Sequence, residues 1–144
     1  MSQFDALVLR VDTYLFGVDT RLVHEVFHPV GITPVPKAAP EVVGLLNLRG
    51  RVVTSVCARR KLDLPPLEAG APIAVGAEIG SDLYGLIVDG IDDVISIDSD
   101  DLVSPSTLPP RWARIVCGVY RLPAGLLLMT EPSRFVLREA RAVA

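Results

Sequence analysis

Short apolar runs, broken every eight to twelve residues by Gly, Pro or Asp, dominate the hydrophobic pattern of the chain. The runs are rich in Val, Ile and Leu, and such segments between turn residues are typical of β-strands. Three pairs of runs are separated by short turn sequences and predict β-hairpins. The pairs are Phe4–Val11 with Tyr14–Val18, Gly44–Leu48 with Arg51–Val56, and Ile73–Ile79 with Leu83–Val88. The pattern therefore predicts a mainly β protein.

Two runs, Ile73–Val75 and Leu126–Met129, are apolar at consecutive rather than alternate positions. Continuous apolar runs are expected in strands that are covered on both faces, and here they indicate closed barrels. Helix is predicted in only two short segments. One is a helical turn within Thr20–Phe27, and the other is a short C-terminal helix over Pro132–Arg141, with a proline near its first position.

The two halves of the chain resemble each other. Gly17–Val26 matches Gly85–Val94 at a constant offset of 68 residues, and Gly44–Gly50 matches Gly118–Gly125 at offsets of 74 and 75. A repeat of this kind indicates two copies of one structural unit. Because units of about 65 to 75 residues bury little surface on their own, we predict two small barrels that share a hydrophobic core.

Composition narrows the class of protein. A chain of 144 residues, half of them hydrophobic and 22% charged, is typical of one globular domain and excludes a disordered protein. The net charge of −3 argues against nucleic-acid binding, which needs clustered positive charge. No run reaches the roughly 18 apolar residues of a membrane span, and the N-terminus lacks signal-peptide features. We therefore expect a cytoplasmic protein with no direct membrane insertion.

Candidate catalytic and metal-binding motifs are weak. His24 and His28 would share one face of a helix, but a metal site needs a third ligand, so we favour surface histidines. The acidic residues between Asp92 and Asp101 lack the glycine-centred loop of an EF-hand and are interpreted as a solvated turn. No nucleophile elbow, phosphate-binding loop or dinucleotide fingerprint is present. We expect no enzymatic activity and no cofactor.

The two cysteines and the lone tryptophan are interpreted as packing residues. Cys57 and Cys117 lie in apolar contexts without a CxxC pair, so we predict buried small hydrophobes rather than a redox site. Trp112 is either a partly exposed interaction residue or a lid over a small core, and we favour the lid.

One arginine stands in an otherwise apolar strand-turn-strand segment, Asn47–Gly50. Such a side chain either projects to solvent or pairs with a carboxylate. Glu25 is an isolated charge in another apolar run and is the partner that the sequence suggests. A partly buried, bidentate Arg49–Glu25 pair would fix one geometry and leave N–H donors for a partner. A solvated turn arginine explains the sequence equally well.

Four segments together resemble the CheW family of chemotaxis coupling proteins. They are Val23–Val26, Ile32–Pro36, Val42–Gly50 and Gly85–Val94. The most specific part is the Asn-Leu-Arg-Gly motif that ends at Gly50, and the resemblance extends over nearly the whole chain. On this basis residues 1–144 are expected to form a single CheW-like domain.

The resemblance implies a fold and a function. The implied fold is a pair of five-stranded SH3-like barrels packed on each other, in agreement with the repeat. The implied function is that of a non-enzymatic adaptor, which couples the cytoplasmic tips of methyl-accepting chemoreceptors to the regulatory domain of a CheA-like histidine kinase. Such an adaptor is cytoplasmic and is recruited to membrane-associated receptor arrays. Other CheW-like proteins are further candidate partners.

The resemblance also implies a binding site. By position, Arg49 matches the family's motif arginine and Glu25 matches its salt-bridge partner. The expected receptor- or kinase-binding residues are Arg49, Glu25, Val23, Val26, Ile32, Asn47, Gly85 and Ile91. The apolar residues and the glycine of this set are expected to line a groove between the barrels, where a receptor helix tip docks.

Two segments depart from the family pattern. Thr54–Arg59 lacks the usual Pro and Asp, and Met129–Pro132 replaces the common C-terminal ending. Two alternatives to the adaptor therefore stay open. One is a CheW-like structural or oligomerisation module of a pilus, motility or surface-sensing pathway. The other is a small-molecule-binding or catalytic barrel, which needs a pocket with convergent polar groups.

Overall fold

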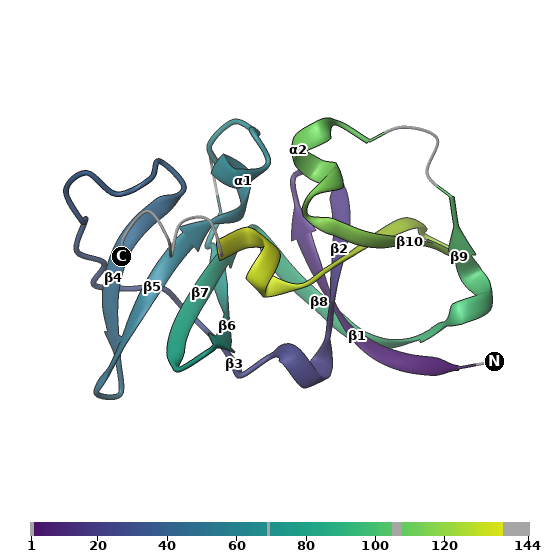
Figure 1. Cartoon of the computed structure of the whole chain (residues 1–144), viewed down its shortest axis with the longest axis horizontal. Helices are drawn as coiled ribbons and strands as arrows, with labels where there is room; N and C mark the ends of the chain where they lie inside the picture. Colours follow the sequence, from purple (N-terminus) through teal and green to yellow (C-terminus); the bar gives the residue numbers. More distant parts are fainter. Residues whose placement is uncertain (1, 69, 105–107, 137–144) are drawn as a thin grey trace.

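A computed structural model describes residues 2–68, 70–104 and 108–136, which fold into two β-sheets that lie side by side (Figure 1). The first sheet contains β1 (Gln3–Val11), β2 (Tyr14–Asp19), β8 (Gly90–Asp98), β9 (Leu102–Val103), β10 (Val116–Leu122) and β11 (Gly125–Thr130). The second contains β3 (Glu25–Phe27), β4 (Val42–Leu48), β5 (Arg51–Cys57), β6 (Ile73–Ile79) and β7 (Asp82–Val88). The predicted mainly β fold is confirmed, and the three predicted hairpins are β1–β2, β4–β5 and β6–β7.

Helical structure among the described residues is short. The segments are η1 (Thr20–Leu22), α1 (Ala58–Lys61), η2 (Ser99–Asp101), α2 (Pro110–Ala113) and residues 132–136. The predicted helical turn within Thr20–Phe27 is correct only for η1, because the chain then extends into β3 and pairs with β6. The predicted C-terminal helix begins at Pro132 as expected, and its part beyond residue 136 lies outside the described residues.

Each half of the chain contributes strands to both sheets: β1 and β2 join the first sheet and β3 to β5 the second, whereas β6 and β7 join the second sheet and β8 to β11 the first. The first sheet has the order β8-β1-β2-β11-β10-β9, and the second has the order β3-β6-β7-β5-β4. β3 follows β2 of the first sheet along the chain but pairs with β6, and β8 follows β7 of the second sheet but pairs with β1. The repeated segments Gly17–Val26 and Gly85–Val94 are these two crossings, from β2 to β3 and from β7 to β8.

The edges of each sheet are brought together by the chain itself. In the second sheet, Thr33 follows β3 and exchanges two backbone hydrogen bonds with Leu45 of β4, at 2.7 and 2.8 Å. This close approach requires Gly44, where a Cβ would lie 2.3 Å from the Thr33 carbonyl oxygen. In the first sheet, η2 joins β8 at one edge to β9 at the other. The first sheet therefore has six strands instead of the expected five, because η2 divides one of them.

The largest hydrophobic cluster of the described residues lies between the two sheets. It includes Leu9 and Phe16 from the first sheet and Val75 and Leu86 from the second, all nearly fully buried. We call this cluster the shared core. Two smaller clusters, one around Ala6, Val8, Ile97, Leu127 and Met129 and one around Phe27, Leu46, Val53, Ala74 and Leu83, fill the separate barrels. The predicted common core is therefore observed.

A buried ion pair ties the two barrels together at one end of the shared core. Arg59 of α1 donates two hydrogen bonds to Asp89, which lies between β7 and β8, from Nε at 2.8 Å and from Nη2 at 2.7 Å. Arg59 also donates to the Pro65 carbonyl at 2.6 Å, and the Asp12 amide in the β1–β2 turn donates to Asp89 at 2.6 Å. Burial by itself raises the pKa of the Asp89 carboxyl, but these hydrogen bonds outweigh it and hold the pKa below its usual value.

The burial of Trp112 agrees with its predicted packing role, whereas the burial of the two cysteines agrees only in part. Trp112 is buried, stacks edge-on against Tyr14, and donates from Nε1 to the Leu62 carbonyl at 3.0 Å, as a lid over the shared core would. The prediction of buried cysteines is wrong for Cys117, which is exposed, whereas Cys57 is half-buried. The register of β10 against β11 shifts at Cys117, and such a bulge turns one extra side chain out of the regular alternation.

Candidate functional site

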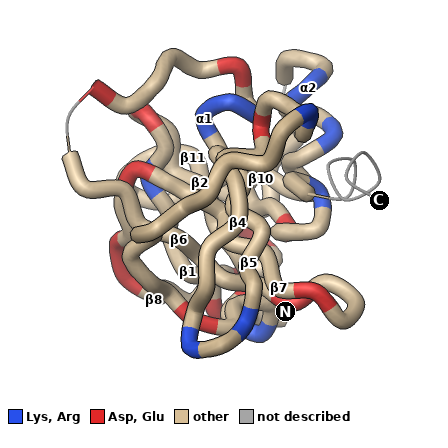
Figure 2. Tube along the Cα trace, turned by 90° about the vertical axis from the view of Figure 1, so that its left-hand side faces the viewer, with Lys and Arg blue, Asp and Glu red and all other residues tan. Residues whose placement is uncertain are grey.

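The β4–β5 hairpin ends in a tight turn that presents an arginine. Arg49 and Gly50 have φ values of 51° and 86°, the left-handed values of a type I′ turn. Asn47 stabilises the turn, because its Oδ1 accepts a hydrogen bond from the Gly50 amide at 2.8 Å. A non-glycine residue in this region costs about 1–2 kcal/mol. Figure 2 shows the resulting basic tip at the end of the hairpin.

Arg49 forms the predicted pair with Glu25, at the start of β3. Both carboxylate oxygens of Glu25 contact Nη2 of Arg49. The pair differs from the predicted geometry in two respects. It uses one guanidinium nitrogen instead of two, and the Arg49 side chain is 69% exposed whereas that of Glu25 is 21% exposed. The hairpin tip carries Arg49 beyond the sheet, so the cation stays in solvent while its partner is half-buried.

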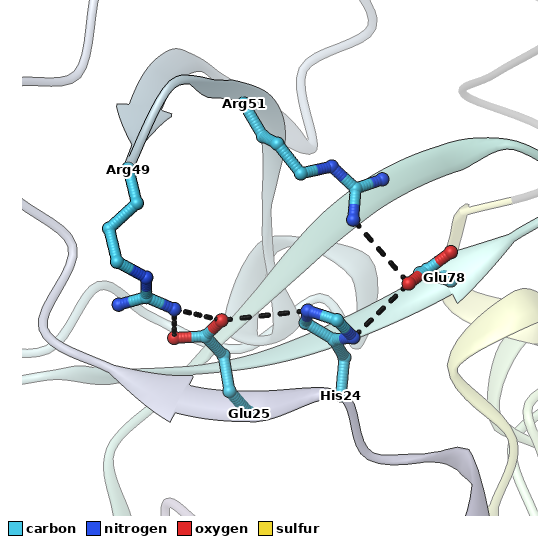
Figure 3. Close-up of polar contacts among 5 residues, drawn as sticks. All are labelled: His24, Glu25, Arg49, Arg51 and Glu78. Atoms are coloured by element: carbon cyan, nitrogen blue, oxygen red, sulfur yellow. Dashed lines mark hydrogen bonds and ion pairs between the residues drawn. The ribbon is translucent and has the colours of Figure 1, made fainter.

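Three further residues extend this pair into a chain of charged and polar groups (Figure 3). Nε2 of His24 lies 3.6 Å from Glu25, and its Nδ1 lies 3.2 Å from Oε1 of Glu78 on β6. The same oxygen of Glu78 accepts a hydrogen bond from Nη1 of Arg51 at 3.4 Å. The sequence analysis missed Glu78, since no sequence signal links it to a residue about 50 positions away.

The predicted apolar site residues fall into two groups. Val23 and Ile91 pack against the shared core and are half-buried, and Val26 is 41% exposed and pairs in register with Val75 of the shared core. These three residues lie where the two sheets meet. Ile32 instead packs against the interior cluster of the second barrel.

Gly85 does not line a surface. It is buried in β7, and a Cβ added there would lie 3.0 Å from Cζ of Phe27 and 3.3 Å from Cγ1 of Val53. The glycine leaves room for the Phe27 ring, which anchors β3 to the second barrel two residues from Glu25. The expectation that Gly85 lines a groove is therefore corrected to a packing role.

Residues 5–138 match the family described as the CheW-like domain. The chain belongs to this family. It is 25% identical to the chemotaxis protein CheW of Rhizobium meliloti, over 97% of the chain and 92% of the relative, and 25% identical to that of Treponema pallidum, over 90% and 80%. The crystal structure of the scaffolding protein TtCheW from Thermoanaerobacter tengcongensis superposes with a TM-score of 0.82 and 23% identity, over 94% of both chains. That structure has the same fold.

Two other kinds of feature are not found among the described residues. Within the described ranges, no helix is both long and apolar enough to cross a membrane. Nor do any three His, Cys, Asp or Glu residues gather there in an arrangement that would hold a metal ion. His24 and His28 are both exposed, as expected for surface histidines.

Proposed function

We propose that the protein is a non-enzymatic adaptor that couples the cytoplasmic tips of methyl-accepting chemoreceptors to the regulatory domain of a CheA-like histidine kinase. It acts in the cytoplasm and is recruited to membrane-associated receptor arrays. Membership of the CheW-like family and the names of its relatives, which are chemotaxis and scaffolding proteins, support this proposal.

The observation that carries the proposal is the Arg49–Glu25 pair. Glu25 accepts hydrogen bonds from Nη2 of Arg49. The Nε and Nη1 atoms of Arg49 can therefore donate hydrogen bonds to a partner. Arginine is enriched among the few residues that carry most of the binding energy of protein interfaces. Val26, the next residue on β3, is exposed on the opposite face of the strand and supplies a nearby apolar contact. An apolar helix tip with an exposed hydrogen-bond acceptor has the complementary chemistry.

Co-sedimentation of the protein with receptor-containing membranes and kinase tests the proposal. Arg49→Ala is expected to weaken the complex about thirtyfold, as truncation of a central arginine does, while the circular-dichroism spectrum stays unchanged. Glu25→Ala is expected to weaken the complex less, because the cation remains but is free to move. Arg134→Ala, which removes an exposed ion pair with Glu131, is the matched control and should bind normally.

Unchanged co-sedimentation of both Arg49→Ala and Glu25→Ala would reject the adaptor proposal for this site. The alternative, a structural or oligomerisation module of a pilus, motility or surface-sensing pathway, gives a different result. The purified protein would then form a stable oligomer in size-exclusion chromatography without receptor or kinase.

A further inference from the structure

We propose that Glu78 is a positioning residue of the docking centre: it binds His24 and Arg51, and thereby leaves Glu25 free to hold Arg49. This inference rests on the proposed role of Arg49 in docking. It concerns residues of this chain that lie outside the motif, and it follows from the order of contacts in Figure 3.

The contacts place three cationic or hydrogen-bonding side chains around two carboxylates. Arg49 and Arg51 flank Gly50 at the tip of one hairpin, and their side chains reach β3 and β6, two strands that do not pair with the hairpin. The two arginines donate to different carboxylates. Arg49 donates to Glu25, and Nη1 of Arg51 donates to Oε1 of Glu78 at 3.4 Å. The hairpin tip is therefore tethered on both sides of the turn.

His24 lies between the two carboxylates and is nearer to Glu78. Its Nδ1 is 3.2 Å from Oε1 of Glu78, whereas its Nε2 is 3.6 Å from Oε1 of Glu25. Glu78 thus engages both groups that would otherwise turn to Glu25.

Loss of Glu78 changes the partner of Glu25. Arg51 and His24 would then have Glu25 as the remaining carboxylate of this five-residue chain, and they would compete with Arg49 for it. An exposed ion pair contributes only about 0–1 kcal/mol, so competition from a second cation is enough to lower the occupancy of the Arg49–Glu25 pair. Arg49 would lose its fixed geometry and would have to be immobilised again on docking.

The test measures binding of the full-length protein to a purified cytoplasmic fragment of a chemoreceptor from the same organism, in the presence of the kinase. Glu78→Ala is expected to weaken binding about three- to tenfold, the range for one side chain that loses its preorganisation. Arg51→Ala added to Glu78→Ala removes the main competitor and is expected to restore most of the affinity. A merely structural defect would not be rescued in this way. Glu78→Gln, which keeps an oxygen acceptor, is expected to bind more tightly than Glu78→Ala.

Glu131→Ala is the matched control. The Glu131 side chain is 47% exposed against 46% for Glu78, and both residues line a surface depression of about 290 Å³ with His24. Glu131→Ala removes one negative charge close to Glu78 but leaves the contacts among the five residues of Figure 3 in place. This variant should therefore bind like the wild type.

The outcomes separate this inference from the proposed function. If Arg49→Ala weakens binding but Glu78→Ala does not, the positioning role is overturned and the docking proposal stands. If Glu78→Ala weakens binding to the same extent in an Arg49→Ala background, or if Arg51→Ala gives no rescue, Glu78 acts otherwise and the inference fails. If Arg49→Ala binds normally, the docking proposal itself fails.

Discussion

Asp89→Ala removes the carboxylate that connects three segments of the fold. Asp89 accepts two hydrogen bonds from Arg59 of the second barrel and one from the Asp12 amide of the first. The Arg59 and Asp89 side chains are only 11% and 13% exposed. In this variant the Arg59 guanidinium stays buried. Its remaining partners are the Pro65 carbonyl and the Asp12 carboxylate, which is more distant at 3.3 Å.

Removal of one partner from a buried, hydrogen-bonded pair costs about 3–5 kcal/mol. This loss is a large part of the 5–15 kcal/mol typical of a folded domain. For a chain of this length, 1 kcal/mol corresponds to about 2–4 °C in melting temperature, so Asp89→Ala is expected to melt about 6–20 °C below the wild type. The double variant Arg59→Met, Asp89→Leu removes both charges and should be more stable than Asp89→Ala, because no charge remains buried.

Urea unfolding followed by circular dichroism measures both variants. A loss below about 1 kcal/mol in Asp89→Ala, or a double variant less stable than the single one, would refute the argument that the loss comes from a buried guanidinium deprived of its main partner.

The pH dependence of stability gives a second check. The hydrogen bonds hold the pKa of Asp89 below its usual value. A carboxyl with a lower pKa in the folded state adds stability that is fully present above its unfolded pKa, near pH 4, and is lost as the pH falls through the folded value. The stability advantage of the wild type over Asp89→Asn should therefore shrink below about pH 4. An advantage that stays constant in acid would contradict the hydrogen-bonded, ionised Asp89.

Three further predictions concern single residues. Arg49→Asn relieves the left-handed backbone at the hairpin tip and should raise the free energy of unfolding by about 1 kcal/mol in urea unfolding, while co-sedimentation weakens as in Arg49→Ala; unchanged stability would show that the backbone at Arg49 is not strained. The Oγ of Ser55 is buried without a hydrogen-bond partner, so Ser55→Ala should be neutral or stabilising by about 1 kcal/mol in the same unfolding assay; a clear loss would mean that the hydroxyl is satisfied. Trp112→Phe keeps an aromatic lid but loses the hydrogen bond to the Leu62 carbonyl, which should cost about 1–2 kcal/mol in thermal unfolding; an unchanged melting temperature would show that this bond contributes nothing.

The hairpins and the repeat were predictable because they depend on neighbouring residues. The turns at Asp12-Thr13 and Arg49-Gly50 are two residues long, and the apolar runs on either side pair directly across them. The two barrels with a common core followed from the repeat. Two interleaved barrels were expected, but the points at which the chain crosses between the sheets, from β2 to β3 and from β7 to β8, were not predicted, since the sequence does not record which of two similar hairpins a following strand will join.

The candidate site was predictable in part. The Arg49–Glu25 pair followed from two isolated charges in apolar segments, and the structure forms it. The exposure of Arg49 depends on how far the hairpin tip projects from the sheet, which is a tertiary property. Gly85 was assigned to a groove, but its neighbour across the barrel is Phe27, and only the closed sheet brings the two together.

The sequence by itself determined the local elements, the duplication and the family, because apolar periodicity, turn residues and short motifs are properties of contiguous residues. Only the tertiary structure decided which side chains share a site. His24, Glu25, Arg49, Arg51 and Glu78 come from three separate segments. They meet because the chain crosses to the second sheet after β2, which places β3 beside β6, and the tip of the β4–β5 hairpin lies close to both. Contacts between distant segments depend on how the two sheets close and pack, and no local pattern of residues encodes that.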